Sequence, residues 1–223
     1  VPNMRGMQDA VRVGVEQISV FGSASESFSR KNINCTIDES LQRFSEVVQV
    51  AKTKKMRVRG YLSMCFGCPF EGKVSEAKVV ELAEKMLAMG MYEISIGDTI
   101  GVANPKQVKR IVQALVSAIG VNRLAMHFHD TRGLALANVV ASLDQGIEVF
   151  DSSVGGLGGC PYAPSSAGNL ATEDVVFLLH EMGLDTKIDL EKLLTVNKWI
   201  ENEIGHELPS RVGKAGIPRV RPI

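Results

Sequence analysis

Two histidines, His127 and His129, stand two residues apart in the segment LAMHFHD. The segment predicts a strand whose three apolar residues share one face, while the two imidazoles share the other face. Neighbouring imidazoles can hold one divalent cation, because each neutral ring offers a nitrogen as a ligand. A pair of hydrogen-bonded core histidines is the alternative. The position at the end of a strand, just before Asp130, favours the metal site.

A cysteine, Cys160, lies in the glycine-rich segment GGLGGCPYAPSSAGNL. The glycines allow the backbone to move or to approach a ligand closely, and Pro161 restricts that freedom. A thiol here can donate or accept a proton if it is partly exposed near a cation or an imidazole. An inert cysteine in an ordinary loop is the alternative. Asn169 and Glu173 follow on one face of an expected helix start that points back toward the strand ends, although capping that helix is a second possible role for Asn169.

Alternating helices and strands are expected to position these residues. Asn3 is predicted to cap the first helix, Thr36 and Glu39 form a capping box, and Asn104 precedes Pro105 at another helix start. The predicted helices cover residues 3–14, 36–54, 75–90, 133–146 and a segment that begins at residue 104. The predicted strands cover residues 16–21, 56–64, 92–98, 123–130 and 148–154.

Strands that alternate with helices through short links predict an α/β fold with a parallel sheet. No GxGxxG motif lies between a strand and a helix, and polar residues follow nearly every strand, as they do in an enzyme built on a barrel. We therefore expect a (β/α)8 TIM barrel, of which this chain supplies about five of the eight strands; an open sheet is the alternative. The polar residues at the strand ends are Ser23, Ser25, Glu26, Ser63, Asp98, Thr99, His129, Asp130, Ser152 and Ser153.

The composition favours a small ligand and an intracellular setting. Lys plus Arg and Asp plus Glu both number 25, so no overall charge draws the chain to nucleic acid or to an anionic membrane. No apolar run reaches the roughly 20 residues of a membrane span, and four cysteines are too few for a disulfide framework. The spacing of Cys65 and Cys68 also fits a redox or half-zinc site, which the lack of a second CxxC disfavours. We expect one catalytic domain over residues 1–223, with residues 205–223 as a C-terminal tail.

Several segments together resemble the 3-hydroxy-3-methylglutaryl-CoA lyase family, part of a group of metal-dependent lyases and aldolases built on (β/α)8 barrels. The resemblance runs from the first residues to about Leu194. The cysteine loop is its most specific part, because the wider group, which includes isopropylmalate and homocitrate synthases and hydroxy-oxovalerate aldolases, shares HxH but not GGLGGCPYA. The segments are NINCTIDES, GYLSMCFGCPFEGKV, YEISIGDTIGVANP, HFHDTRGLALAN and SVGGLGGCPYAPSSAGNLATED.

The resemblance implies a retro-Claisen cleavage of hydroxymethylglutaryl-CoA into acetoacetate and acetyl-CoA. It implies a small acyl-CoA substrate, a homodimer, and either a bacterial cytoplasm or a mitochondrial matrix. The implied ligands of Mg2+ or Mn2+ are His127, His129 and Asn169. Cys160 and His127 are the implied proton-transfer residues. Asp98, Glu173 and Thr99 are expected to support the ligands or to contact the substrate.

One feature of the family is missing from the sequence. The family carries an Arg-Asp pair at the end of its first strand, where the arginine stabilises the enolate and the aspartate binds the metal, and this chain has no Arg-Asp dipeptide. We expect the matching segment to precede Val1, which agrees with the missing strands. A related aldolase or a condensing enzyme that joins an acyl-CoA to a keto acid, and a non-catalytic fragment, are the alternative functions.

Overall fold

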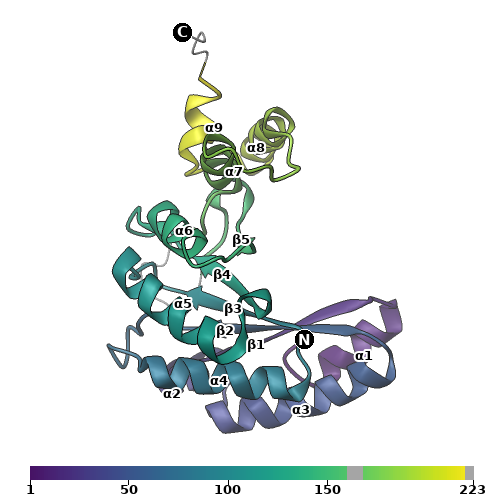
Figure 1. Cartoon of the computed structure of the whole chain (residues 1–223). Coiled ribbons are helices and arrows are strands. Elements are labelled where there is room, and N and C mark those ends of the chain that lie inside the picture. The colour runs from purple at the N-terminus through teal and green to yellow at the C-terminus, as the bar shows by residue number, and fades with distance from the viewer. Residues whose placement is uncertain (160–167, 219–223) are drawn as a thin grey trace.

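The computed structural model describes residues 1–159 and 168–218, and its centre is a sheet of five parallel strands. The strands follow one another in chain order, β1-β2-β3-β4-β5, so each connection carries the chain to the next position in the sheet (Figure 1). This arrangement confirms the predicted α/β class and is that of a partial barrel. The strands are β1 (Gln17–Ser23), β2 (Arg57–Ser63), β3 (Glu93–Asp98), β4 (Leu124–Phe128) and β5 (Phe150–Asp151).

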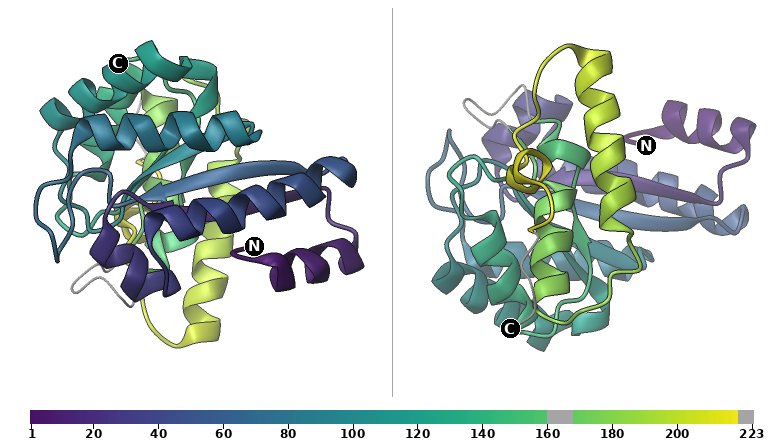
Figure 2. Two further views of the ribbon diagram at one scale, coloured as in Figure 1. Left: turned by 90° about the horizontal axis from the view of Figure 1, so that it is seen from below. Right: turned by 90° about the horizontal axis from the view of Figure 1, so that it is seen from above.

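Helices connect the strands and cover one face of the sheet, as the two views of Figure 2 show. Helix α3 packs on β1 and β2, α4 packs on β2 and β3, and α6 packs on β4. Helices α7, α8 and α9 gather beyond β5. The helices are α1 (Met4–Val13), α2 (Glu26–Ile33), α3 (Ile37–Thr53), α4 (Glu76–Met89), α5 (Pro105–Ile119), α6 (Ala135–Leu143), α7 (Thr172–Glu181), α8 (Leu190–Ile204) and α9 (Arg211–Ala215), with 3-10 turns η1 (Val121–Arg123) and η2 (Val154–Gly156).

The predicted helix starts are confirmed where a side chain caps the helix. The Asn3 side chain accepts a hydrogen bond from the Gly6 amide, and Asn104 does the same for α5, whose first residue is Pro105. Both halves of the capping box between Thr36 and Glu39 are present. These starts depend on neighbours within one turn, which is why the sequence alone reveals them.

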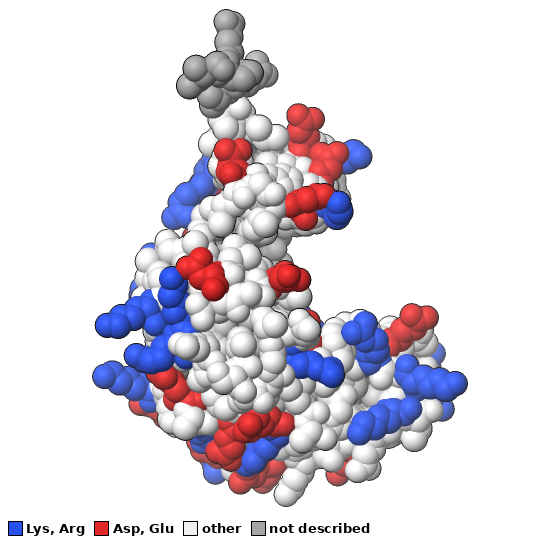
Figure 3. Space-filling view, viewed as in Figure 1, with Lys and Arg blue, Asp and Glu red and all other residues white. Residues whose placement is uncertain are grey.

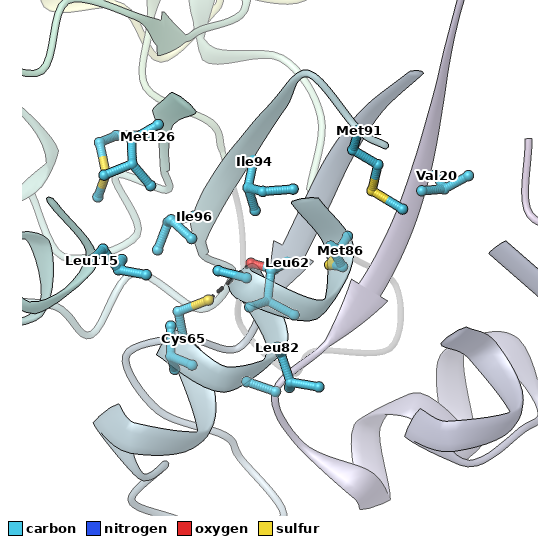
Figure 4. Close-up of a cluster of buried hydrophobic side chains, with 14 of the residues drawn as sticks. Val20, Leu62, Cys65, Leu82, Met86, Met91, Ile94, Ile96, Leu115 and Met126 are labelled. Carbon is cyan, nitrogen blue, oxygen red and sulfur yellow. Dashed lines mark hydrogen bonds between the residues drawn. The ribbon is translucent and has the colours of Figure 1, made fainter. Parts of the chain in front are cut away.

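The core lies between the sheet and the helices that cover it (Figure 4). Side chains from one face of the strands meet the apolar stripes of α4 and α5, and burying them supplies most of the driving force for folding. Met86 is buried here. Gly60 makes room for it, since an added Cβ would lie 2.7 Å from the Met86 Cε atom. The labelled core residues from the strands are Val20, Leu62, Ile94, Ile96 and Met126, and those from the helices are Leu82, Met86 and Leu115.

Two elements near the predicted site differ from expectation. Strand β5 is only Phe150–Asp151, shorter than the predicted 148–154. Asn169 is not on a helix and does not cap one, because α7 begins at Thr172 with Ala171 as its N-cap. The segment is extended instead: the Leu170 amide donates to the Phe128 carbonyl at 3.0 Å, so its backbone continues the sheet beside the end of β4.

The structure describes the segment predicted as a tail up to residue 218, whereas residues 219–223 lie outside the described part. The buried Asp174 carboxylate accepts hydrogen bonds from the Ser210 hydroxyl at 2.7 Å and from the Val212 amide at 2.8 Å. Leu208 is itself 1% exposed. The start of α9 is therefore held against α7 by a buried carboxylate, and Leu208, which precedes α9, packs over Gly155.

The surface carries both signs of charge. Lysine and arginine side chains are interspersed with aspartates and glutamates over the face shown in Figure 3, in keeping with 25 residues of each sign. Among residues 1–159 and 168–218, no helix is both long enough and apolar enough to cross a bilayer.

Candidate active site

The two histidines of the HxH motif lie side by side at the C-terminal end of β4. Their ring centroids are 5.4 Å apart and the rings are tilted by 55°. Phe128, between them in sequence, is 1% exposed and points into the core. The predicted division of the strand into an apolar face and an imidazole face is confirmed. His129 is 5% exposed, whereas the His127 side chain keeps 28% of its surface exposed.

Asn169 lies directly beside His129, although the two residues are forty positions apart. They oppose each other in an antiparallel bridge, and opposed residues of such a pair project their side chains to the same face. The Asn169 Nδ2 atom donates to the Leu157 carbonyl at 2.8 Å. This bond fixes which end of the amide faces Leu157 and leaves the Oδ1 oxygen as the end that can bind a ligand.

Three buried polar atoms of this cluster have no hydrogen-bond partner among the residues that the structure describes: His127 Nδ1 and, opposite each other, His129 Nδ1 and Asn169 Oδ1. An unsatisfied buried polar atom costs about 1–3 kcal/mol, so a ligand that pairs with the His129 and Asn169 atoms would stabilise the site. An imidazole nitrogen beside an amide oxygen suits Mg2+ or Mn2+. The pair therefore fits a divalent cation, although no cluster of three His, Cys, Asp or Glu side chains forms such a site within the described ranges.

Burial keeps the His129 ring neutral at physiological pH. Removal from water, together with the smaller effect of the neighbouring His127, lowers the pKa of His129 to about 4. A neutral imidazole has a lone pair free for a cation, whereas a protonated ring has none. The site is thus ready to bind a metal without first losing a proton.

Asp98 and Thr99 shape the loop that follows β3. The Asp98 carboxylate accepts hydrogen bonds from the Val102 and Ala103 amides at 2.9 and 3.0 Å, and burial raises its pKa to about 6 despite those bonds. The Asp98 carbonyl accepts from the His129 amide at 3.3 Å. Thr99 Oγ1 accepts from the Met64 amide. These contacts bring the β3 loop against the histidine strand through the backbone, and a role in ligand or substrate binding stays a prediction.

Glu173 anchors the start of the glycine-rich loop. Its carboxylate is fully buried and accepts from the Gly155 amide with both oxygens, at 2.8 and 3.0 Å, and from the Asn197 side chain at 3.0 Å. Gly155 has φ +64 and Leu208 packs directly over it. Glu173 therefore holds the backbone of the loop at Gly155 and is not hydrogen-bonded to the imidazoles. Its link to Asn169 is indirect, because the same loop carries the Leu157 carbonyl that accepts from Asn169.

A polar network inside the sheet was not predicted from the sequence. The Arg59 guanidinium donates to Glu93 at 2.5 Å and to Asp151 Oδ1 at 2.7 Å, and Ser95 donates to Asp151 Oδ2 at 2.6 Å. Asp151 Oδ2 in turn lies 3.6 Å from His127 Nδ1. A usable signal did exist, because these residues are polar side chains at alternate positions of otherwise apolar strands.

The charged groups of this network stabilise one another. Burial alone would raise the pKa of Asp151, yet its contacts with His127, Ser95 and Arg59 hold that pKa below the usual value. Asp151 is thus an ionised carboxylate beneath the imidazoles.

A separate cavity of about 220 Å3 opens beside Asn169 and is lined in part by Asp130 and Arg211. The Asp130 carboxylate and the Arg211 guanidinium form an ion pair at 3.1 Å.

The model of the HMGL-like family matches residues 1–200 of this chain. The chain belongs to the HMGL-like family. It is 49% identical over 214 residues to a mitochondrial hydroxymethylglutaryl-CoA lyase of Gallus gallus, which covers 96% of this chain and 72% of the relative. It is 51% identical over 211 residues to the hydroxymethylglutaryl-CoA lyase YngG of Bacillus subtilis, covering 95% of this chain and 71% of that protein.

Solved structures of HMGL-like proteins share the fold. A hydroxymethylglutaryl-CoA lyase from Pseudomonas aeruginosa superimposes with a TM-score of 0.92 at 47% identity, covering 96% of this chain and 71% of that chain. A lyase from Acinetobacter baumannii in complex with coenzyme A and 3-methylmalate superimposes with a TM-score of 0.94 at 41% identity, covering 100% and 73%. These HMGL-like neighbours confirm the predicted family and TIM-barrel fold.

The relatives of this HMGL-like chain come from more than one compartment and are longer than it. They include vertebrate proteins named as mitochondrial, a bacterial protein and a rat protein named as cytoplasmic. The chain spans 72% of the Gallus gallus relative and 66% of the mitochondrial Rattus norvegicus relative. Members of the family generally depend on a divalent metal.

The structure describes the thiols of Cys65 and Cys68 but not that of Cys160. Cys160 lies outside the described residues, so its role stays a prediction. Cys65 and Cys68 are buried, and neither is in a disulfide within the described part of the chain. Burial raises the pKa of the Cys65 thiol to about 12, and the Cys68 sulfur lies 3.0 Å from the Ser25 hydroxyl oxygen. A thiol with so high a pKa is unreactive, which argues against the redox alternative for this CxxC pair.

Proposed function

We propose that this chain carries most of the catalytic barrel of a hydroxymethylglutaryl-CoA lyase. The reaction would cleave hydroxymethylglutaryl-CoA into acetoacetate and acetyl-CoA. The observation that carries the proposal is the pairing of a neutral buried His129 with the free oxygen of Asn169, beside the more exposed His127. The close relatives, about half identical and named as lyases of this kind, support it.

Three side chains would hold the divalent cation, Mg2+ or Mn2+: His127, His129 and Asn169. When bound, the cation would supply a positive charge that lowers the pKa of the substrate's tertiary hydroxyl. Asn169 contributes an oxygen whose direction is set by the Leu157 carbonyl. His129 contributes a nitrogen that burial keeps free of a proton.

We assign the proton movements of the reaction to two residues. The hydroxyl proton must leave as the C2–C3 bond breaks, so that C3 becomes the ketone of acetoacetate and the bonding electrons pass to C2. The resulting enolate of acetyl-CoA must then receive a proton at C2. His127, which keeps part of its ring exposed, and Cys160, on the loop that Glu173 anchors at Gly155, are the groups we assign to these transfers.

The identity of the products tests this function. Purified protein is incubated with hydroxymethylglutaryl-CoA and Mn2+, and acetoacetate and acetyl-CoA are quantified separately. We expect equal amounts of both. A related condensing enzyme would instead consume acetyl-CoA when offered a 2-keto acid and release no acetoacetate. Absence of both reactions in a protein that is folded by circular dichroism would favour the non-catalytic alternative.

A further inference from the structure

Asp151 lies beneath the candidate metal site and faces one particular atom of it. Its Oδ2 oxygen is 3.6 Å from the Nδ1 nitrogen of His127. The two residues are direct neighbours in the register of β4 and β5, so their side chains project to the same face of the sheet. His127 Nδ1 is buried and has no hydrogen-bond partner among the described residues, and a small rotation of the ring would bring it into hydrogen-bond range of the carboxylate.

The carboxylate of Asp151 is held in one orientation by its neighbours, so it can orient the His127 ring. Arg59 grips Oδ1 at 2.7 Å and Ser95 donates to Oδ2 at 2.6 Å. Arg59 is itself only 8% exposed and also donates to Glu93. These contacts tie the carboxylate to β2 and β3, the two strands on the far side of β4.

His127 is also confined from the other sides. Its ring packs edge-on against Tyr61 with the centroids 6.3 Å apart, and its neighbour His129 lies 5.4 Å away. Tyr61 hydrogen-bonds to the Arg59 guanidinium. The same arginine therefore supports both the carboxylate and the aromatic wall that flank the imidazole.

We propose that Asp151 is a positioning residue that accepts a hydrogen bond from the Nδ1–H group of His127 and thereby fixes the tautomer in which Nε2 carries the free lone pair. A histidine ring presents one nitrogen to a metal or a substrate and uses the other to hold its orientation. The inference rests on the proposed function, because it assigns Nε2 of His127 as the nitrogen used at the active site.

The chemistry of an amide gives this proposal a sharp consequence. In Asp151→Asn, the side chain keeps one oxygen, and we expect that oxygen to stay on the Arg59 guanidinium, which donates hydrogen bonds and cannot accept one. The NH2 group of the asparagine then takes the place of Oδ2. That group can only donate, so its partner on the ring, Nδ1, must be unprotonated. The proton then moves to Nε2 and blocks the ligand nitrogen. The near-isosteric variant should therefore damage the site more than Asp151→Ala, which imposes no tautomer.

Mn2+ affinity provides the first test. Titration of the wild-type protein and its variants with Mn2+ alone, followed by electron paramagnetic resonance, measures the dissociation constant directly. We expect Asp151→Asn to weaken binding at least about tenfold, the scale of supporting residues at metal sites, and Asp151→Ala to weaken it less. Asp144→Asn is the matched control, because Asp144 pairs with Lys109 at an exposed site, and its affinity should stay within about twofold. A loss in Asp151→Ala that equals or exceeds the loss in Asp151→Asn would overturn the proposal.

The tautomer of His127 provides a second test that needs neither activity nor a variant. Nitrogen-15 correlation spectra of the metal-free wild-type protein distinguish a protonated ring nitrogen from a bare one, and the chain has only four histidines to assign. We expect the proton on Nδ1 and a bare Nε2. A protonated Nε2 at pH 7.5 refutes the inference. If Nε2 is bare and yet no acetoacetate is released, the proposed function fails while the role of Asp151 stands.

Discussion

His129 and Asn169 oppose each other in an antiparallel bridge, and each ends in a buried atom, Nδ1 in one and Oδ1 in the other, that has no partner in the part of the chain that the structure describes. The extended segment before α7 thus completes a site that β4 begins. Backbone hydrogen bonds bring the two proposed ligand atoms together, so we expect their separation not to depend on the metal. The predictions below follow from this preformed site and from the contacts that hold it.

The metal-free protein should lose stability in mild acid because of His129. Its pKa is about 4 in the native state and about 6.5 in an unfolded chain. Between these values the unfolded chain binds a proton that the native chain does not, so the free energy of unfolding falls as the pH drops from 6.5 to 4. The loss should be on the order of 3 kcal/mol. Urea unfolding in EDTA at several pH values measures this loss. His129→Gln should lose less stability over the same pH range, because it lacks the titrating ring. Parallel curves of stability against pH for the two proteins would show that the pKa of His129 is not lowered by burial.

Gly155→Ala should destabilise the domain by crowding the C-terminal segment. An added Cβ would lie 2.2 Å from the Leu208 Cδ1 atom, and the residue has φ +64. Gly183→Ala is the matched control, because Gly183 has φ +77 with nothing within 4 Å of the added atom. The positive φ should lower the free energy of unfolding of each variant by about 1 kcal/mol or more. Overpacking against Leu208 should lower that of Gly155→Ala by roughly a further 1–3 kcal/mol. Thermal unfolding compares the stabilities of the two variants. Equal losses of stability would mean that the Leu208 side chain moves aside at no cost.

Asp174→Ala should release α9 from α7. The substitution leaves the Ser210 hydroxyl and the Arg211 and Val212 amides without their shared acceptor. Limited trypsin digestion should then cleave at Arg211 or Lys214 faster than in the wild type, by roughly tenfold for a loss of about 1.4 kcal/mol. Asp185→Ala removes an exposed carboxylate paired with Lys187 and should leave the cleavage rate unchanged. Identical digestion of all three proteins would mean that Asp174 does not hold the segment.

Cys160→Ser should impair turnover while sparing the metal site. The thiol is assigned to proton transfer and not to cation binding, so Mn2+ affinity and thermal stability should stay near wild type. Turnover of hydroxymethylglutaryl-CoA should fall by ~10²-fold or more, the contribution of one proton-transfer group. Steady-state kinetics at saturating Mn2+ measure this change. Near-normal turnover would make the thiol a bystander.

The parts of the fold that the sequence predicted well depend on local chemistry. The capping box at Thr36 and Glu39, the proline start of α5 and the shared face of His127 and His129 are each set within four residues. Residues this close constrain one another whatever the rest of the chain does. The HxH motif could therefore be placed on one face of a strand end before any tertiary contact was known.

The parts that sequence analysis missed depend on distant backbone pairing. The sequence predicts Asn169 at a helix start, yet hydrogen bonds between Leu170 and both Phe128 and Ser153 hold the segment around Asn169 extended. Phe128 and Ser153 are distant in sequence, so no local pattern could predict these hydrogen bonds. The Arg59–Asp151 contact joins residues 92 positions apart. Finding it requires the register of four strands, because only the register shows that these polar side chains share a face.

The dependence of acetoacetate release on Mn2+ concentration, measured for the wild type and for His129→Ala, tests the central claim most directly. Activity of the wild type should rise from near zero in EDTA to a plateau, and the variant should need at least about tenfold more Mn2+ or show no activity, because it lacks one of the proposed ligands. Full wild-type activity in EDTA, or saturation of both proteins at the same Mn2+ concentration, would contradict a catalytic metal at His129.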